Sequence, residues 1–470
     1  MEGHGERQRL MPPTIVTNTR YSSSDLGLAP EPGRGAGCRR RYLALVLFSW
    51  FAFSQGLARS ISFTTEDTFP FMNTTTNRLL LSSWSAVGFL AFPVFMYLMD
   101  KNGLRTSLMA ALFALLLGSG LRCIPSAPPG AQTWLIHSSQ LLIAMAGPSA
   151  IAAAPFISST WFPQDERSIA TAIGALANYL GAASAFLIQS ILAHSVDGLA
   201  TPGGLRLLSH GPIEAHVLLK RMQIMLYVEF GMIAILFVLV VLLMPRHPLL
   251  YPSTSAATRR LHYTEAIPRL LRRPGFWLAV AVYAFPLGVG SAWLKQLDSL
   301  LKSHLTTIVG CAELAAVLAG YLGALAVARL SDNFTGRLKV IILILLSGAT
   351  LSAIWFTLSC LDMVSFLTFS TANLFVTCIL FGAFLVGAVP LLLELLVEVT
   401  FPVPEGLSCG LAAFVSIACI TLPINVMAAS SPNLNWLSWS LVGGCALGTL
   451  GILLLPESYG RLHMDVILSV

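Results

Sequence analysis

The sequence predicts an all-α membrane protein with twelve transmembrane helices in two pseudo-symmetric six-helix bundles. Hydrophobic residues make up 55% of the 470-residue chain and charged residues 11%, whereas charged residues make up roughly 25% of ordinary globular domains. Apolar runs of about 20 residues, the length that crosses a bilayer core, recur from Tyr42 to Leu455. In addition, similar polar turns recur in the two halves of the chain.

Each apolar run must form a helix, because the bilayer offers no partner for open backbone groups. The six runs of the first half lie at about 42–62, 79–99, 104–124, 133–156, 167–194 and 219–244. The six runs of the second half lie at about 276–300, 309–330, 338–361, 371–397, 406–429 and 434–455. They divide the chain into a polar tail (1–40), an N-terminal bundle (41–245), a cytosolic linker (246–275), a C-terminal bundle (276–457) and a second tail (458–470).

A charged turn between the second and third runs has a second copy between the eighth and ninth. Acid, glycine and base follow one another in both copies, which lie at Asp100–Arg105 and Asp332–Lys339. The fifth run begins after Phe162-Pro163, and the eleventh begins after Phe401-Pro402. These matches indicate an internal duplication, and two parallel halves are typical of a carrier whose bundles rock around a central site. For a single such turn, the alternative is that Asp, Gly and Arg are common in any cytosolic turn.

The placement of charge predicts the orientation of the chain. Of the 28 Lys and Arg residues, about 20 fall on the side of the two termini, which the positive-inside rule assigns to the cytosol. The chain has a net charge of +6. Its basic residues flank the apolar runs, so they indicate membrane topology and contact with lipid rather than nucleic-acid binding. The eight cysteines occur singly, and no hydrolase, metal or nucleotide motif stands in its required context. We expect neither an enzyme nor a cofactor or metal site.

Polar residues inside the apolar runs are candidates for a substrate or proton pathway, because a charge there costs about 2.5–3.5 kcal/mol to insert. Glu229 lies near the middle of the sixth run, and His137 and Gln140 share one face of the fourth. The seventh run carries three further candidates, which are Tyr283, Trp293 and Asp298. The alternatives are a structural acid for Glu229, a packing histidine for His137 and a membrane-interface anchor for Trp293.

Several motifs resemble a known family. The turn Asp100–Arg105 and the ending Pro456–Arg461 are similar to the major facilitator superfamily, and Glu394–Gly406 resembles the feline leukaemia virus subgroup C receptor-related (solute carrier 49) family. Within that family, the chain resembles the disrupted-in-renal-carcinoma branch of lysosomal transporters. The resemblance lies at residues 120–125, 154–156, 160–162, 286–289 and 457–462. The resemblance covers residues from about 41 to 470. It implies the major facilitator fold and a lysosomal carrier of a small organic solute.

The solutes of this family include haem, choline or ethanolamine, and vitamin B6. The chain has Tyr179 where the choline-carrying relatives have Gln, and Ala58–Ser62 lacks the aromatic residues that those relatives place there. Since an aromatic cage usually holds a quaternary ammonium, the resemblance disfavours choline. It leaves a vitamin B6-like solute as the leading candidate and adds Tyr179 and Glu394 to the candidate pathway.

The superfamily pattern also implies a cytosolic gate, because its first charged turn meets the eleventh helix and its second meets the fifth. The expected gate residues are Asp100, Lys101, Arg105, Asp165, Glu166, Asp332, Arg337, Lys339 and Glu405. The expected pairs are Lys101 and Arg105 with Glu405, and Arg337 and Lys339 with Asp165 or Glu166. Such pairs would exist only while the cytosolic mouth is closed.

Two short motifs bear on location. Glu6, Leu10 and Met11 resemble an acidic dileucine sorting signal that binds an adaptor complex, and Asn73 begins a glycosylation sequon in the first non-cytosolic loop. We expect a multi-pass protein of the lysosomal (endolysosomal) membrane with both termini in the cytosol. The alternative location is the plasma membrane.

The sequence therefore predicts a secondary active transporter that moves a small polar organic solute by alternating access, with protons as the candidate coupling ion. Its expected partners are the solute, protons and the lipid bilayer. Two alternatives stay open. One is a non-transporting lysosomal sensor or scaffold with a carrier fold, and the other is a haem- or choline-type carrier at another membrane.

Overall fold

The computed structural model describes residues 37–68, 75–124, 129–197, 212–246, 248, 252–257, 260–301, 306–333, 337–361, 370–431, 433–456 and 459–467. Within these residues every regular element is a helix, so the predicted all-α class is confirmed. The predicted sorting residues Glu6, Leu10 and Met11 and the sequon residue Asn73 lie outside the described residues.

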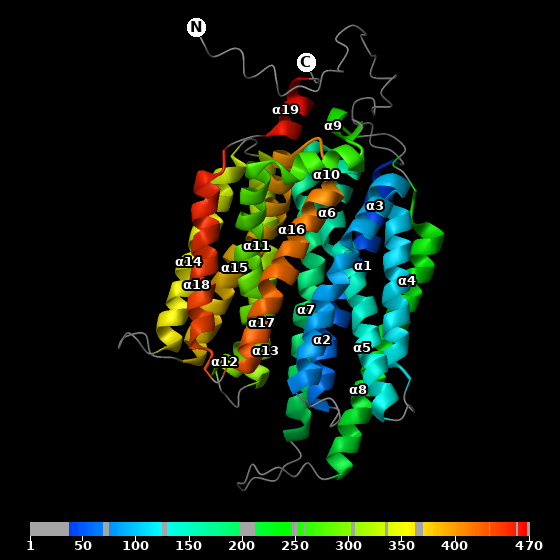
Figure 1. Ribbon diagram of the computed structural model, residues 1–470, viewed down its shortest axis with the longest axis vertical. Helices are drawn as coiled ribbons and strands as arrows, with labels where there is room; N and C mark the ends of the chain where they lie inside the picture. Colours follow the sequence, from blue (N-terminus) through cyan, green and yellow to red (C-terminus); the bar gives the residue numbers. More distant parts are fainter. Residues whose placement is uncertain are drawn as a thin grey trace.

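The N-terminal bundle is formed by the helices coloured blue to green on one side of the molecule (Figure 1). In chain order they are α1 (Gly37–Thr68), α2 (Thr75–Val87), η3 (Gly88–Ala91), α3 (Phe92–Asn102), α4 (Leu104–Arg122), α5 (Pro129–Met145), α6 (Gly147–Trp161), η4 (Gln164–Glu166), α7 (Arg167–Asp197) and α8 (Pro212–Leu243). The linker that follows holds two short helices, α9 (Thr254–Ala257) and α10 (Tyr263–Leu271).

The C-terminal bundle lies beside the first and is coloured green to red (Figure 1). In chain order its elements are α11 (Pro274–Lys295), α12 (Leu297–Leu301), α13 (Thr306–Asn333), α14 (Leu338–Cys360), α15 (Thr371–Thr400), α16 (Glu405–Phe414), the π-helical η5 (Val415–Thr421), α17 (Leu422–Ser430) and α18 (Asn435–Leu454). A last helix, α19 (Gly460–Ile467), follows this bundle.

The number of spans is consistent with the predicted twelve. In the described part of the chain, ten helices are long and apolar enough to cross a membrane by length and composition. Two further rods, α2–α3 with η3 between them and α7, pack beside these helices. The predicted third and ninth runs begin at Leu104 and Leu338, where α4 and α14 begin.

Prolines mark the places where three of the rods are interrupted. Pro93 and Pro423 are the second residues of α3 and α17, which follow η3 and η5, and Pro148 is the second residue of α6, after the break that follows α5. Proline has no N–H to donate to the carbonyl four residues earlier, so an α-helical bond is lost at each site. The chain responds with a 3-10 turn, a single turn residue or a π-helical turn.

Helices α1 and α7 cross at small residues. A Cβ atom added to Gly56 would lie 2.0 Å from the Asn178 carbonyl oxygen, and one added to Gly181 would lie 2.0 Å from the Phe53 carbonyl oxygen. Only glycine allows the two backbones to approach this closely, as is usual where membrane helices pack. The crossing therefore fixes α1 against α7 inside the N-terminal bundle.

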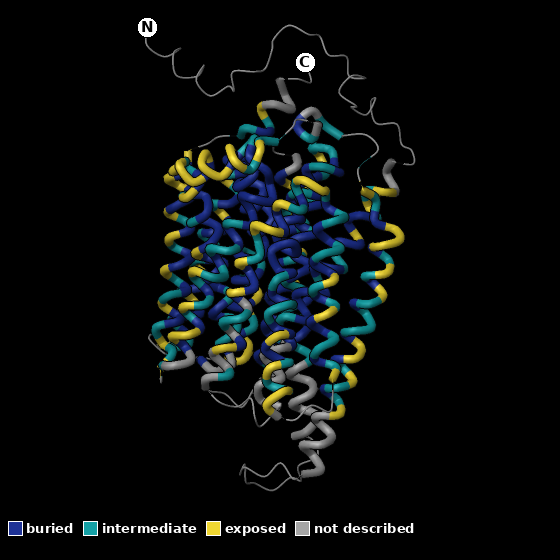
Figure 2. Tube along the Cα trace, turned by 45° about the vertical axis from the view of Figure 1, so that its right-hand side comes forward, coloured by how far each residue is buried: buried dark blue, intermediate teal, exposed yellow. Residues whose placement is uncertain are grey.

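Large apolar side chains cover the outside of the molecule. Exposed residues lie along the outer faces of the rods and buried residues lie between them (Figure 2). Val228, Leu242 and Leu454 are each more than 60% exposed. A bilayer would cover such faces, because its hydrocarbon core is as apolar as these side chains.

One end of the molecule, here called the basic end, carries the start of α1, the short helices α9 and α10, and α19 (Figure 1). The opposite end is called the far end. The segment predicted as a C-terminal tail includes α19, which packs against α15 and α9. Its Arg461 is only 3% exposed, so this part of the tail belongs to the folded structure.

Candidate functional site

Arg461 joins the C-terminal helix to two acidic residues of α15. Its Nη2 atom forms an ion pair with Glu394, and its Nε atom lies 3.0 Å from Glu398 Oε1. The backbone N–H groups of Arg461 and Leu462 donate to Glu398 Oε2 at 3.0 and 3.2 Å. Burial by itself would lower the pKa of Arg461, but the two carboxylates raise it above its ordinary value. These charge-assisted bonds hold α19 on the basic end.

Glu394 also joins the two bundles. Thr171 Oγ1, on α7, donates to Glu394 Oε1 at 2.6 Å. Ser158 Oγ, on α6, lies 2.7 Å from Thr171 Oγ1 and 3.5 Å from Glu394 Oε1. The hydroxyl groups come from the N-terminal bundle and the carboxylate comes from the C-terminal bundle. This contact can therefore exist only while the bundles lie together at the basic end.

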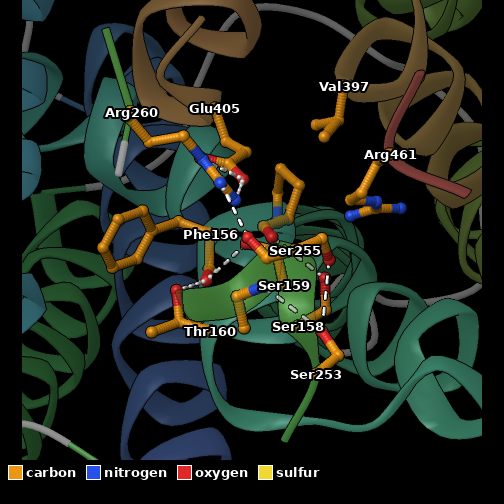
Figure 3. Close-up of polar contacts among 12 residues, drawn as sticks. Phe156, Ser158, Ser159, Thr160, Ser253, Ser255, Arg260, Val397, Glu405 and Arg461 are labelled. Carbon is orange, nitrogen blue, oxygen red and sulfur yellow. Dashed lines mark hydrogen bonds and ion pairs between the residues drawn. The ribbon is translucent and has the colours of Figure 1, made fainter. Parts of the chain in front are cut away.

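The linker places a second arginine on the C-terminal bundle. Arg260 Nη2 lies 2.5 Å from Glu405 Oε1, and Arg260 Nε lies 3.1 Å from each oxygen of that carboxylate (Figure 3). Arg260 Nη1 donates to the Ser255 carbonyl at 2.8 Å, and the guanidinium carbon lies 5.2 Å from the centroid of the Phe401 ring. Bidentate pairing and ring stacking are geometries that arginine makes and lysine does not.

The linker is also tied to the N-terminal bundle. Arg167 Nη2, at the start of α7, donates to Ser253 Oγ at 2.5 Å and to Ser255 Oγ at 3.1 Å. Ser253 Oγ in turn accepts from the Ala256 backbone N–H at 3.2 Å, which is the bond of a serine that caps a helix N-terminus. The short helix α9 thus connects α7 of one bundle to α16 of the other.

Asp100 lies next to this connection. The Tyr263 hydroxyl, on α10, donates to Asp100 Oδ2 at 2.6 Å. Burial raises the pKa of Asp100 to about 7, although the Tyr263 hydrogen bond opposes this change. Glu405 raises the pKa further and Arg260 lowers it. Asp100 is therefore a group outside the membrane spans that titrates near neutral pH while the basic end is closed.

The predicted pairs of Lys101 and Arg105 with Glu405 are wrong in this structure. Lys101 Nζ donates to the Tyr97 hydroxyl at 2.6 Å, and Arg105 Nη2 donates to the Val241 carbonyl of α8 at 2.6 Å. Glu405 takes Arg260 instead. The physical reason is that Arg105 points along its own bundle, where it satisfies a carbonyl in the last turn of α8 that lacks a helical partner.

The second charged turn behaves in the same way. Lys339 Nζ donates to the Leu455 and Leu453 carbonyls at the end of α18, at 2.7 and 3.3 Å. Glu166 pairs at 3.0 Å with Arg41 of its own bundle. The predicted pairing of Lys339 with Glu166 is therefore wrong. Arg105 and Lys339 do correspond, because each caps the last long helix of its own bundle.

Three gate predictions remain without a described pairing. Asp165 and Arg337 are exposed, and no ion pair joins them among the described side chains. The side chain of Asp332 lies outside the described residues, although α13 includes its backbone.

A buried polar cluster lies inside the N-terminal bundle, nearer the far end. Arg122 Nε donates to Ser139 Oγ at 2.6 Å, Nη1 to the Ala58 carbonyl at 2.9 Å and Nη2 to Gln140 Oε1 at 2.8 Å. The predicted residue Gln140 thus holds an arginine. Glu229 is 3% exposed and interacts electrostatically with Arg122, but its carboxylate forms no hydrogen bond to any described residue.

His137 lies on the same helix as Gln140. Its side chain is 5% exposed, and neither ring nitrogen bonds to a described residue. The ring of Trp134 lies 6.4 Å away. A small pocket beside the cluster is lined by Leu121, Arg122, Ile124, Gln132, Leu135, Ile136 and Leu226. Glu229 and His137 therefore stay candidates for proton binding.

The bundle centre holds a second polar arrangement. Asn178 Nδ2 donates to Gln55 Oε1 at 2.7 Å and to the Ala52 carbonyl at 3.0 Å, while Gln55 Nε2 donates to the Ile143 carbonyl at 3.3 Å. The next residue along α7, the predicted Tyr179, is half-buried, and the predicted Tyr283 of α11 is buried in the C-terminal bundle.

Other predicted pathway residues lie elsewhere. Trp293 is 1% exposed and packs edge-on against Phe356 and Phe381, at 4.8 and 5.3 Å between ring centroids. The alternative of a membrane-interface anchor is therefore wrong, since the ring is in the core of the C-terminal bundle. Glu394 lies at the basic end, as described above. The side chain of Asp298 lies outside the described residues.

Sequence reasoning missed the roles of Arg260, Arg461 and Arg167. Arg260 lies in the linker (246–275), whose basic residues indicated only topology, and Arg461 belongs to the family-like ending Pro456–Arg461. The sequence did contain a signal, because glutamates stand at 394, 398 and 405, inside or beside two apolar runs, and a carboxylate buried there requires a cation. Spacing could not assign which arginine serves which glutamate.

Comparison with known proteins places the chain in a family. The model of the Major Facilitator Superfamily matches residues 41–420. The solute carrier family 49 member 4 homolog of Xenopus laevis is 40% identical over 440 residues, which is 92% of this chain and 94% of the relative. The choline/ethanolamine transporter flvcr2b of Danio rerio is 30% identical over 334 residues, which is 68% of this chain and 63% of the relative.

Solved structures share the fold. The major facilitator transporter FucP, crystallised in the outward conformation, matches with a TM-score of 0.64 at 15% identity and covers 89% of this chain and 100% of its own. The xylose transporter XylE of E. coli, in a partially occluded inward open conformation, matches with a TM-score of 0.61 at 13% identity and covers 89% and 98%.

Proposed function

Because the chain belongs to the major facilitator superfamily and, within it, to solute carrier family 49, it is a membrane transporter, and we propose that it is a secondary active carrier of a small polar organic solute. The carrier acts in the lysosomal membrane by alternating access, and its transport is coupled to protons. A vitamin B6-like molecule is the leading solute, on the basis of the sequence resemblance.

The observation that carries this proposal is the polar contact between the bundles at the basic end. Thr171 of one bundle bonds to Glu394 of the other, and Glu394 is held in place by Arg461. These groups are polar, so water can replace the contacts when the end opens. An interface of this kind supports two states of similar free energy, which is what alternating access requires.

Two buried groups support proton coupling. Glu229 and His137 lie inside the N-terminal bundle and make no hydrogen bond to a described side chain or backbone group. A buried carboxyl and a buried imidazole are the groups that gain or lose a proton as their surroundings change between states. In an acidic lumen, their protonation would favour one state over the other.

Solute flux tests the proposal directly. Full-length protein is reconstituted in vesicles with an acidic interior, and uptake or efflux of radiolabelled pyridoxine, choline and ethanolamine is measured. We expect pyridoxine flux that a protonophore reduces. The Glu229→Gln variant should carry pyridoxine without this dependence on the pH gradient. Flux no greater than that of protein-free vesicles, for every solute in the panel, would contradict the proposal.

Location has a separate test. The relevant residues, Glu6 to Met11 and Asn73, lie outside the described residues. Replacing Glu6, Leu10 and Met11 by alanine should move the tagged protein from lysosomes to the plasma membrane, as adaptor recognition predicts. Asn73→Gln should lower the apparent mass to that of the glycosidase-treated protein. Wild-type protein found at the plasma membrane would support the alternative location instead.

A further inference from the structure

Arg59 is a charged residue within a membrane span that the contacts described above leave unexplained. It lies on α1 one helical turn beyond Gln55, and its chain neighbours Ala58 and Ser60 are 0% and 4% exposed. Arg59 itself is half-buried. Because a charge avoids lipid, its accessible part is expected to face water rather than the bilayer.

Arg59 forms no hydrogen bond or ion pair with a described residue. The crossing of α1 and α7 places Tyr179 near it, because Asn178, the residue before Tyr179, bonds to Gln55, one turn before Arg59. Tyr179 is also half-buried. The buried acids of the described chain have other neighbours. Glu394 and Glu398 pair with Arg461, Glu405 pairs with Arg260, Glu229 interacts with Arg122, and Glu313 interacts with Cys378.

The backbone that carries Arg59 is held rigidly. Gln55 bonds to Asn178 and to the Ile143 carbonyl, and Gly56 and Gly181 let α1 and α7 touch. Tyr179 directly follows Asn178 in α7. The Arg59 and Tyr179 side chains thus start from a fixed crossing of two helices, and fixed positions are what a binding site requires.

We propose that Arg59 and Tyr179 form an anion-binding subsite that receives a carboxylate, phosphate or phenolate group of the transported solute. A charge inside a membrane span is costly to insert, so one without a described carboxylate partner is by default a candidate for a functional site. A guanidinium group binds planar or tetrahedral anions through paired hydrogen bonds. A quaternary ammonium would be repelled here. The inference rests on the proposed carrier function and narrows its solute to one that carries an anionic group.

The test compares solutes that differ mainly in charge. Thermal stability of the purified full-length protein is measured with nicotinate and nicotinamide, with pyridoxine 5′-phosphate and pyridoxine, and with choline, since a ligand of the folded state raises stability. We expect the anionic member of each pair to stabilise the wild type. Arg59→Gln should weaken that binding by about 10- to 100-fold, because it removes hydrogen bonds to a charged group. Arg59→Lys should retain part of it.

Controls separate a lost subsite from a lost fold. Arg272→Gln removes an exposed arginine of the linker and should leave anion binding unchanged. Phenylglyoxal, which modifies guanidinium groups, should label Arg59 in the wild type, and the anionic solutes should protect it. Anion binding that persists in Arg59→Gln, a preference for choline, or failure of phenylglyoxal to reach Arg59 would each overturn the subsite.

The subsite and the carrier function can fail separately. Flux of pyridoxine 5′-phosphate that Arg59→Gln leaves unchanged would overturn the subsite and leave the carrier proposal standing. Anion binding that depends on Arg59, in a protein that carries no solute of the panel, would support the subsite and contradict the carrier proposal.

Discussion

The basic end and the bundle centre use arginine in opposite ways. At the basic end, Arg260 and Arg461 are joined to Glu405, Glu394 and Glu398 by short polar contacts. In the centre, the half-buried Arg59 forms no hydrogen bond or ion pair with a described residue. Satisfied buried charges hold parts of a protein together, whereas a buried charge that lacks a counter-ion marks a place for a ligand. The ion pairs of the basic end therefore form a closing device, which differs from the binding site proposed at Arg59.

The closing device is stable only while it stays complete. Removing both partners of a buried ion pair can be nearly neutral, but removing one partner leaves a charge in a poor environment. Opening the basic end to water solvates all the charges together, which makes the open state accessible. The following changes test how far each contact contributes to closure.

The largest effect is expected from Arg461. Arg461→Met leaves Glu394 and Glu398 buried without their cation, which should destabilise the closed basic end by about 3–5 kcal/mol. Spin labels at Asn102→Cys and Arg337→Cys, exposed positions on the two bundles, should move apart. Adding Glu394→Gln and Glu398→Gln should restore most of the lost stability. An unchanged label distance in Arg461→Met would show that the C-terminal helix does not hold the end closed.

A smaller effect is expected from the linker arginine. Arg260→Gln removes the bidentate bond to Glu405 and should cost about 1.5–3 kcal/mol, measured as thermal stability and label distance. Exchanging the charges, with Arg260→Glu and Glu405→Arg together, should recover part of the loss. The exchange of Arg105 with Glu405 should not recover it, because Arg105 bonds to α8. Equal recovery by both exchanges would argue against a specific pair.

The effect expected from the protonation of Asp100 is the smallest over a single pH unit. In the closed state burial raises the pKa of Asp100 to about 7 from its ordinary value of 3.8. A proton bound more tightly in the closed state stabilises that state at low pH. This stabilisation is lost as the pH rises from about 4 to about 7, by at most tenfold in the closed-to-open ratio per pH unit.

Asp100→Asn offers the matched variant for this measurement, because asparagine can still accept the Tyr263 hydrogen bond. Its label distance should increase less between a pH of about 4 and about 7 than the wild-type distance, which should increase with pH. Identical pH profiles for the two proteins would assign the titration to another group.

The sequence predicted the fold well because its strongest signal is apolar run length, which the bilayer imposes on each helix. The starts of α4 and α14 were found at Leu104 and Leu338. The partners at the basic end were predicted poorly. Arg105 and Glu405 lie at matching turns, but a pattern does not show toward which neighbour a long side chain turns. It also does not place Arg260 of the linker, which crosses between the bundles.

The two capping contacts have a consequence for how the molecule moves. Arg105 ties the start of α4 to the end of α8, and Lys339 ties the start of α14 to the end of α18. Each half therefore contains an internal brace that fastens its third long helix to its sixth. Rearrangement during a transport cycle should then be a rigid-body rotation of one half against the other, with distances within each half preserved.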